Sequence, residues 1–482
     1  MRYVSGNNFG SNKNTLLTLY KALIRSKIDY GCQIYQTATD NALQILNTIQ
    51  AKALRIALGA TRNTPNISLL AESGEWPLHL RREKLTLKYW ARTQPLGLEF
   101  PPNKIIEEAK NYSYIFKERT KQHKKPPYNY LIREILEKHQ LSDIKIEKQI
   151  VNPQIPWLAV EPETSTELLD KVNKKDNPLV ANSIVQATIE EKYQNYTQIY
   201  TDGSKQNEKV GLGIYIPEFK VKISGRISNY TSIYTSELLA IQIALKTVEL
   251  KQPDRVVILS DSLSSIQSIE TNNSSRDDIL KAIQLSITKI DQLGIDLKFE
   301  WIPSHINIKG NDIADQLAKD SLSHKEIDIN IKLSPSEVYS LINKSLETVW
   351  TKQWLEIVNN ELRNIQETPI KKVTMYSYDT YEDKIITRIR LGKTKLKSDR
   401  AQMIRTLDPN CIDCQIPETL HHVIFQCPNH QIHRNELREK LGKLEIPFTK
   451  IQDILTSQIT NRQLAYRYLI LFIKNIGYIK NI

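Results

Sequence analysis

The chain has 482 residues, of which 40% are hydrophobic and 25% charged, a balance typical of folded domains that excludes a long disordered protein. A single hydrophobic core rarely serves so long a chain, so we expect several domains. The formal net charge of +12 indicates either a polyanionic partner such as nucleic acid or a soluble protein that is simply basic.

Apolar side chains recur at helical spacing over residues 14–95. The first set consists of Leu16, Leu17, Tyr20, Leu23, Ile24 and Ile28. The second set, which Gly59 is well placed to terminate, consists of Leu43, Leu46, Ile49, Ala53 and Ile56. Pro77 suits the first turn of a third helix that runs to about Arg92. We therefore predict a helical segment over residues 1–95.

Residues 96–195 are rich in proline and carry a run of basic side chains. The prolines indicate a linker with short elements. The basic run either contacts phosphate or is a solvated part of the linker, and it consists of Lys117, Arg119, Lys121, Lys124 and Lys125.

The pattern changes at about residue 196 to alternating extended and helical segments. Extended segments are expected at 197–201, 210–216, 219–227, 255–260 and 296–302. Helices are expected at 235–250, in the stretch that ends near 293, and at 311–322. This order predicts an α/β domain over 196–325, with a mixed five-stranded sheet and flanking helices. Helical patterns return over 326–482.

Four carboxylates lie at the ends of these predicted elements. Asp202 and Asp261 follow strands, Glu237 lies in the first turn of a helix, and Asp315 lies in the last helix. Each alone has a plain structural explanation as a turn residue, a helix-dipole partner, a cap or a solvated residue. Because the ends of neighbouring strands converge on one rim of a sheet, their joint occurrence indicates a shared site.

Carboxylates that crowd together raise one another's pKa, and a divalent cation removes that cost. Hard oxygen ligands with open water positions suit Mg²⁺, for which Mn²⁺ can substitute. Two ions about 3.5–4 Å apart can stabilise both the attacking and the leaving oxygen of a phosphodiester. The acids therefore predict hydrolysis of a phosphodiester without a nucleophile from the protein.

Residues 196–325 resemble the ribonuclease H domain of the retrotransposon type. The first three acids lie in motifs that match this family, namely Thr201-Asp202-Gly203-Ser204, Ser236–Ile241 and Ser260-Asp261-Ser262. The family's longest signature is matched between Trp301 and Lys319, and it includes His305, Ile308, Gly310, Asn311 and Asp315.

The resemblance implies two Mg²⁺ ions held by the four acids and endonucleolytic cleavage of the RNA strand of RNA–DNA hybrids. The products would carry a 3′-hydroxyl and a 5′-phosphate. His305 would assist proton transfer or product release, with a loop histidine of no function as the alternative. Contacts to the 2′-hydroxyl would distinguish RNA from DNA, and the expected substrate contacts are Gly203, Ser204 and Asn311.

Residues 15–92, including Tyr30-Gly31 and 46–55, resemble the thumb and connector segment of jockey-type non-LTR retrotransposon reverse transcriptases. An unrelated helical bundle is the alternative. The Asp-Asp pair of the chain, Asp277-Asp278, lies inside the nuclease region and lacks the aromatic context of a polymerase palm. We therefore expect no polymerase activity from a chain that resembles the C-terminal part of such a polyprotein without the palm.

A Cys/His cluster lies at residues 411–427, with the spacing Cys411-x2-Cys414-x7-His422-x4-Cys427. Three thiolates and one imidazole suit tetrahedral zinc, with a reduced, metal-free loop as the alternative. The cluster resembles the one downstream of the nuclease in the same retrotransposons. His421 and His430 are rival ligands. The basic stretch upstream indicates a nucleic-acid contact or a solvated helix, and it consists of Arg388, Arg390, Lys393, Lys395, Lys397 and Arg400.

The four cysteines do not form a disulfide framework and fit a reducing compartment. The N-terminus has no apolar core of a signal peptide, and the apolar stretch from Leu464 to Ile476 is too short to span a bilayer. We expect an intracellular protein, nuclear or cytoplasmic, without membrane contact. A working nuclease and a catalytically silent nucleic-acid-binding remnant are the two competing functions.

Overall fold

The computed structural model describes residues 1–6, 10–109, 126–148, 160–172, 177–370, 373–456 and 459–482. The chain forms two compact units. One contains the described residues of 1–87, 112–135 and 343–482, and the other contains those of 88–111 and 136–342. The basic run of the expected linker, from Lys117 to Lys125, lies outside the described residues.

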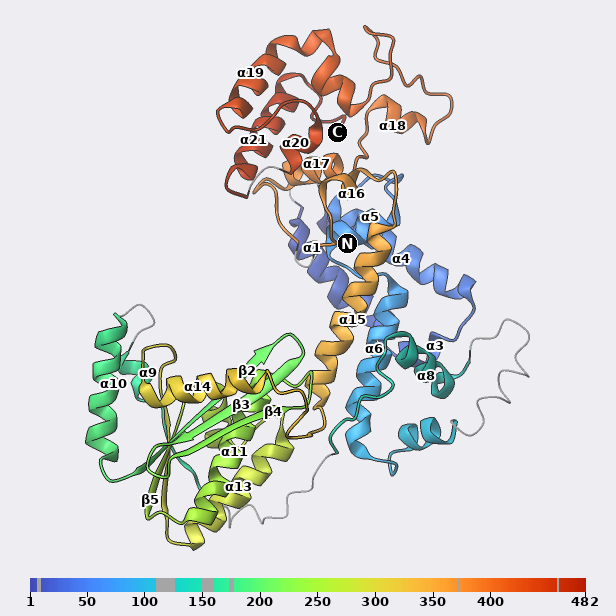
Figure 1. Ribbon diagram of the computed structural model, residues 1–482. Coiled ribbons are helices and arrows are strands. Elements are labelled where there is room, and N and C mark those ends of the chain that lie inside the picture. The colour runs from blue at the N-terminus through green and yellow to red at the C-terminus, as the bar shows by residue number, and fades with distance from the viewer. Residues whose placement is uncertain (7–9, 110–125, 149–159, 173–176, 371–372, 457–458) are drawn as a thin grey trace. The chain divides into compact units, whose positions relative to one another are not determined.

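The second unit is built on a six-stranded mixed sheet in the order β1-β6-β5-β2-β3-β4 (Figure 1). An antiparallel meander is formed by β2 (Thr197–Gln206), β3 (Lys209–Ile216) and β4 (Val221–Ile227). Beside it, β5 (Arg255–Ser260) and β6 (Asp296–Trp301) run parallel to β2. The predicted mixed α/β sheet is thus confirmed.

A sixth strand that we did not predict, β1 (Glu163–Ser165), pairs in parallel with β6 at the edge of the sheet. The strand is three residues long and has no apolar side chain, so it lacks the alternation that indicates a strand. Its position is stabilised from the side, since Ser165 donates a hydrogen bond of 3.0 Å to Glu300 of β6.

Helices cover both faces of this sheet (Figure 1). Side chains such as Ile199 and Ile258 pack on one face with the helices α11 (Ile233–Lys251), α12 (Leu263–Thr271) and α13 (Asp277–Gln292). Their neighbours Tyr200, Val257 and Leu259 pack on the other face with α10 (Pro178–Tyr193) and α14 (Lys309–Ser321). The central strands are apolar at successive positions because both faces are covered. Short α9 (Leu168–Lys171) also belongs to this unit.

The first unit is helical. As predicted, Gly59 ends a long helix, α4 (Asp40–Leu58), in the left-handed conformation at φ 64°, and α6 (Leu78–Thr93) begins directly after Pro77. Three helices have residues in both units, namely α6, α8 (Tyr128–Lys138) and α15 (Pro335–Leu355). The other helices of this unit are α1 (Lys13–Tyr20), α2 (Ser26–Asp29), α3 (Cys32–Tyr35), α5 (Asn66–Ser73), α16 (Glu361–Ile365), α17 (Thr380–Arg390), α18 (Lys397–Ala401), α19 (Gln431–Gly442), α20 (Ile451–Leu455) and α21 (Ile459–Asn475).

Buried charges join the two ends of the chain within this helical unit. Arg390 of α17 lies 3.1 Å from the fully buried carboxylate of Glu72 in α5, which also accepts a 2.6 Å hydrogen bond from the Tyr376 hydroxyl. Lys13 of α1 forms a second buried pair, 3.2 Å long, with Asp383. Buried ion pairs therefore connect the N-terminal helices with the C-terminal region inside one compact unit.

The basic stretch upstream of the Cys/His cluster is partly built into that core. Arg388 donates to the carbonyl oxygen of Gly59 at 2.6 Å and to that of Ile482 at 3.0 Å, and Arg390 pairs with Glu72. The prediction that these two arginines contact nucleic acid or solvent is wrong, because both guanidinium groups are buried and already paired. No helix among the described residues is long and apolar enough to cross a lipid bilayer.

Candidate active site and metal centre

Three of the four predicted acids converge at one edge of the sheet. Carboxylate oxygens of Asp202, Glu237 and Asp261 all lie within 4.8 Å of one another. The parallel pairing of β2 and β5 ends at Thr201 and Ser260, so Asp202 and Asp261 follow at the same level of two adjacent strands. Glu237 reaches the same point from the second turn of α11. The juxtaposition predicted for these three residues is therefore present.

The local structure around Asp202 differs in one respect from the sequence-based expectation. Asp202 does not end its strand, because β2 continues to Gln206 through its antiparallel pairing with β3. Asp202 lies opposite Gly213, where a Cβ atom would come within 2.0 Å of the Ala314 carbonyl oxygen. The missing side chain lets α14 approach β3, and this approach brings Asp315 toward the acids.

Asp315 lies at the margin of the group. It is not among the three carboxylates that share the 4.8 Å limit, but its charge and a hydrogen bond with Asp202 contribute to the raised pKa of Asp202. Its side chain is 26% exposed, and Lys319 lies 2.5 Å away, one turn further along α14. The structure thus places three acids together and the fourth beside them.

The three clustered carboxylates are partly or fully removed from water: Asp202 and Glu237 are buried, and Asp261 is half-buried. Burial, followed by the charge of Asp261, raises the pKa of Asp202 to about 8. Burial also raises the pKa of Glu237 and of Asp261 above their usual ranges. The Oε2 atom of Glu237 is buried and has no hydrogen-bond partner in the described part of the chain. Hard oxygen donors with an unused buried oxygen fit a divalent cation such as Mg²⁺.

This electrostatic arrangement predicts how stability depends on pH when no divalent cation is bound. Folded Asp202 keeps its proton up to about pH 8, whereas its ordinary pKa is 3.8. The folded state then binds more protons than the unfolded state between these values, so its stability falls as pH rises through that window. We expect Asp202→Asn to raise the melting temperature of the magnesium-free protein by roughly 5 °C or more at pH 8, and by less at pH 5. A variant that is no more stable at pH 8 would contradict the assignment.

The remaining predicted site residues surround the acids at different depths. Gly203 is buried, and its amide donates to Asp202 at 2.7 Å; a Cβ atom there would meet the Ser236 hydroxyl at 2.3 Å. Ser204 is half-buried. Asn311 donates to the Asp261 carboxylate at 3.5 Å, and its own Oδ1 is buried without a partner among the described residues. Asn311 therefore has an unused acceptor next to the acids.

His305 lies on the exposed loop between β6 and α14, in the left-handed conformation at φ 60°. Burial raises the pKa of Asp261, and the charge of the nearby His305 opposes that shift. The loop is attached to α10 by Asn182, whose amide donates to the carbonyl oxygens of Ile306 and Asn307 at 2.9 and 2.8 Å. Our sequence reasoning missed Asn182, because no local pattern connects it with a loop more than a hundred residues away.

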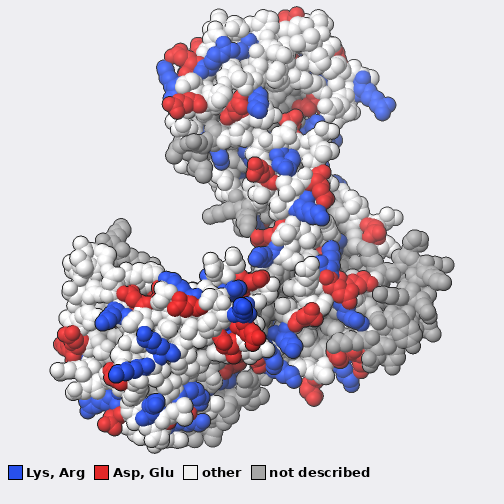
Figure 2. Space-filling model, in the orientation of Figure 1, with Lys and Arg blue, Asp and Glu red and all other residues white. Residues whose placement is uncertain are grey.

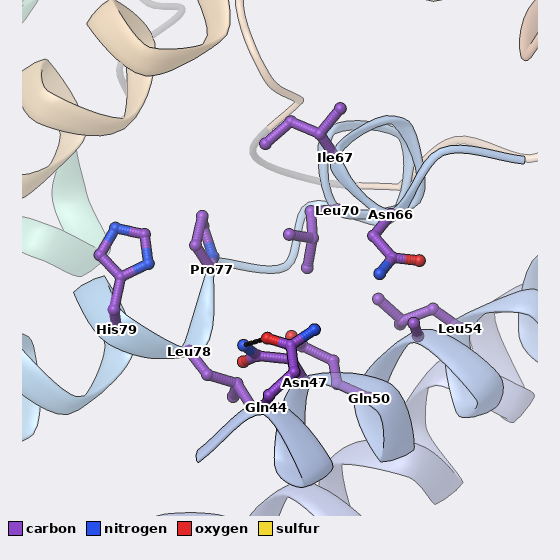
Figure 3. A pocket seen from close by; sticks show the side chains of 11 residues that line it. Gln44, Asn47, Gln50, Leu54, Asn66, Ile67, Leu70, Pro77, Leu78 and His79 are labelled. Carbon is purple, nitrogen blue, oxygen red and sulfur yellow. Dashed lines mark hydrogen bonds between the residues drawn. The ribbon is translucent and has the colours of Figure 1, made fainter. Parts of the chain in front are cut away.

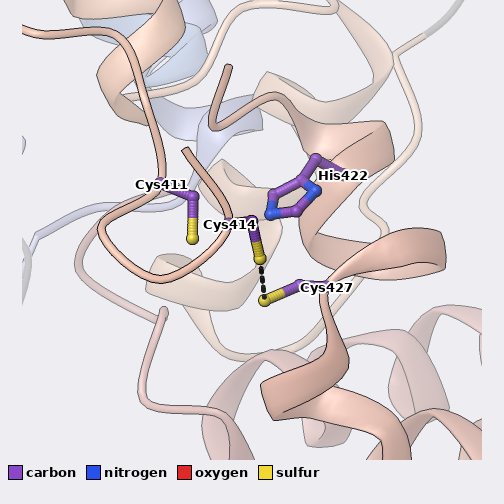
Figure 4. Close-up of side chains that lie close together, drawn as sticks. All are labelled: Cys411, Cys414, His422 and Cys427. Atoms are coloured by element: carbon purple, nitrogen blue, oxygen red, sulfur yellow. Dashed lines mark hydrogen bonds between the residues drawn. The ribbon is translucent and has the colours of Figure 1, made fainter. Parts of the chain in front are cut away.

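The Cys/His cluster has the geometry of a second metal centre. Ligand atoms of Cys411, Cys414, His422 and Cys427 all lie within 4.8 Å of one another, and the four side chains point toward a common centre (Figure 4). Both ring nitrogens of His422 are buried without a hydrogen-bond partner among the described residues. The rival His421 packs on Phe425 and His430 packs on Tyr478. The geometry therefore selects His422, and the donor set fits zinc.

A cavity of about 270 Å³ lies elsewhere, between α4, α5 and the start of α6 (Figure 3). Its polar lining consists of four amide side chains and one histidine, namely Gln44, Asn47, Gln50, Asn66 and His79. Its lining contains none of the clustered acids or cysteines. Because it has no carboxylate that could hold a metal ion, this cavity is not a candidate for the same chemistry.

Charge on the surface is mixed. On the face of the sheet-containing unit shown in Figure 2, Lys and Arg side chains lie interspersed with Asp and Glu. The net charge of +12 therefore does not gather into one positive patch on that face.

Comparison with known proteins identifies a family match within the sheet-containing unit. Residues 194–323 match the RNase H family model. The solved structure of RNase H1 from the halophilic archaeon Halobacterium salinarum NRC-1 is similar at 18% identity, covering 27% of this chain and 98% of that one, with a TM-score of 0.22. No curated protein matches the chain. The strand order, the acids and the family match together define an RNase H domain within the chain.

Proposed function

We propose that the chain is an endonuclease that hydrolyses the RNA strand of RNA–DNA hybrids. The observation that carries the proposal is the group of three carboxylates, two buried and one half-buried, whose oxygens lie within 4.8 Å of one another inside residues that match the RNase H family. Bound Mg²⁺, two ions in the form we propose, would activate water and stabilise charge on the phosphate. Asp202, Glu237, Asp261 and Asp315 would hold the ions.

The other residues of the site would orient the substrate and move protons. In this proposal His305, exposed on its loop near Asp261, would deliver a proton to the leaving 3′-oxygen. The free acceptor of Asn311 suits a ribose 2′-hydroxyl, the group that distinguishes RNA from DNA. Ser204, half-buried two residues after Asp202, could accept a second substrate contact. Lys319 keeps the Asp315 carboxylate turned along α14.

The experiment that tests this function uses the purified full chain with end-labelled hybrid, duplex DNA and duplex RNA in Mg²⁺. We expect cleavage of the hybrid RNA alone, with products that carry a 3′-hydroxyl. A folded chain that binds the hybrid and never cuts it would support the alternative function of a silent nucleic-acid-binding remnant.

We also propose that the chain derives from a retrotransposon reverse transcriptase and has no polymerase activity. The support is the resemblance of residues 15–92 and of the nuclease motifs to jockey-type elements. Primer extension on an RNA template should yield no product, and extension of the primer would refute this part.

For the Cys/His cluster we propose a structural zinc ion. Four protein ligands leave no open position, which is the arrangement of structural rather than catalytic zinc. The purified chain should contain about one zinc per molecule, and Cys427→Ser should lose the metal and lower the melting temperature of the helical unit. Cys32→Ser is the matched control, since Cys32 is equally buried but lies in α3, away from the cluster. A zinc content near zero in a folded chain would contradict the proposal.

A further inference from the structure

One carboxylate, that of Glu337, binds the N-terminal ends of two helices. Within its own helix α15, it accepts from the amide of Ser334 at 2.8 Å and from the Ser334 hydroxyl at 3.0 Å. This is the Ser-x-x-Glu pattern in which a helix begins with reciprocal hydrogen bonds. The other oxygen of Glu337 accepts from the amide of Ser232 at 2.6 Å and from the Thr235 hydroxyl at 2.6 Å.

The second helix that Glu337 binds is the one that carries an acid of the site. Ser232 is the N-cap of α11, and Thr235 lies two residues before Glu237. Hydrogen bonds to both ends of this first turn determine where the turn begins and how it is rotated. Because Glu237 projects from the next residues of the same helix, a shift of the turn would move its carboxylate relative to Asp202 and Asp261.

The contacts of Glu337 are buried and charge-balanced. Glu337 is 4% exposed, and its partner Arg276, only 1% exposed, lies 3.2 Å away at the N-terminal end of α13. Arg276 is itself held by Asp278 at 2.5 Å and by the carbonyl oxygen of Lys332 at 3.0 Å. Although burial alone would raise it, the pKa of Glu337 is lowered by the Thr235 and Ser334 hydrogen bonds and by Arg276, so the group stays ionised at neutral pH.

The chain that leads to Glu337 is also packed on the nuclease sheet. Beyond the end of the family match at residue 323, Asp328 accepts from the Arg226 amide at 2.7 Å, and Ile329 bridges to Ile227 of β4. Ser228 donates to the side chain of Asn330 at 3.1 Å and accepts from the Ile331 amide at 2.8 Å. Residues 328–331 therefore lie along the end of the edge strand, a few residues before Glu337.

We infer that Glu337, which lies outside the matched RNase H residues, is a positioning residue of the nuclease site. It holds the first turn of α11 so that Glu237 meets Asp202 and Asp261. The functional nuclease accordingly extends through the first turn of α15. This inference rests on the proposed hybrid cleavage, but its structural half can be tested without any activity.

The test compares Glu337→Gln with the wild-type full chain. In this variant an NH2 group, which cannot accept a hydrogen bond, replaces one carboxylate oxygen. The NH2 group would face the donors of either α11 or Ser334 and Arg276, so the first turn of α11 should loosen. We expect kcat on the hybrid to fall about 10–100-fold, as for other residues that orient metal ligands, with KM within about twofold. Hydrogen exchange at amides 235–238 should accelerate. Thr235→Val removes the hydroxyl that contacts Glu337 and, at 2.9 Å, the Ser232 hydroxyl, but it keeps the bond from the Ser232 amide to Glu337. It should shift both readouts in the same direction by less.

Glu300→Gln is the matched control. Glu300 is a fully buried carboxylate of the same unit, but its partners are Tyr193 of α10, at 2.7 Å, and Ser165 of β1. It should leave kcat and exchange in α11 unchanged. The inference is overturned if folded Glu337→Gln retains wild-type kcat and exchange, or if Glu300→Gln reproduces its effects. If the wild-type chain cuts no hybrid, the proposed function fails. The hydrogen-exchange measurement then tests by itself whether Glu337 holds the first turn of α11. If Glu337→Gln does not fold, Thr235→Val decides.

Discussion

Asp202→Asn should reduce cleavage of the hybrid RNA at least about a thousandfold, a loss of about 4 kcal/mol in transition-state stabilisation. The amide keeps the size of the carboxylate but loses the negative charge that a divalent cation requires. Asp202 is 6% exposed and lies among the other acids, so no neighbouring side chain can take its place without repacking. Single-turnover cleavage at saturating Mg²⁺ measures the loss.

Asp312→Asn is the control for this loss of activity. The same chemical change is made on α14, in an exposed aspartate that is not among the clustered carboxylates. This variant should cleave the hybrid like the wild type. Equal loss in both variants, or wild-type cleavage by Asp202→Asn, would show that the three carboxylates do not hold the catalytic ions.

Glu72→Ala should destabilise the helical unit by about 3–5 kcal/mol, because it leaves the Arg390 guanidinium buried without its counter-charge. The hydroxyl of Tyr376 would lose its acceptor at the same time. We expect the thermal transition of this unit to fall by many degrees, while the transition of the sheet-containing unit stays in place. Differential scanning calorimetry of the full chain measures both.

Two further variants separate the buried pair from a general effect of charge. Glu439→Ala removes an exposed ion pair with Lys443 on α19 and should leave the midpoint unchanged. Replacing both Glu72 and Arg390 by apolar residues of similar volume should recover most of the lost stability. If Glu72→Ala melts like Glu439→Ala, the proposed joining of the two chain ends through this pair is incorrect.

The strands and acids of the RNase H domain could be predicted because their signals are local. Alternating apolar residues identify β3, a short continuous apolar run identifies β5, and each acid lies within a short motif next to its strand or helix. The Cys/His spacing likewise predicted its cluster, since all four ligands lie between positions 411 and 427 of the sequence.

Features that depend on distant partners could not be predicted in this way. The strand β1 lies beside β6 through Ser165 and Glu300, which are 135 positions apart. Arg390 lies in a basic stretch of the sequence. Nothing near it indicates that its side chain is buried in a pair with Glu72, 318 positions away. The Ser334-x-x-Glu337 pattern does predict a helix start, but not that the same carboxylate also binds α11.

The central claim is that carboxylates from β2, α11 and β5 jointly hold divalent cations, and anomalous diffraction from crystals of the full chain soaked in Mn²⁺ tests it most directly. The proposal predicts an anomalous peak within coordination distance of Asp202, Glu237 and Asp261, absent from crystals of Asp202→Asn. A wild-type crystal without a peak there, at a Mn²⁺ concentration that supports hybrid cleavage in solution, would contradict it.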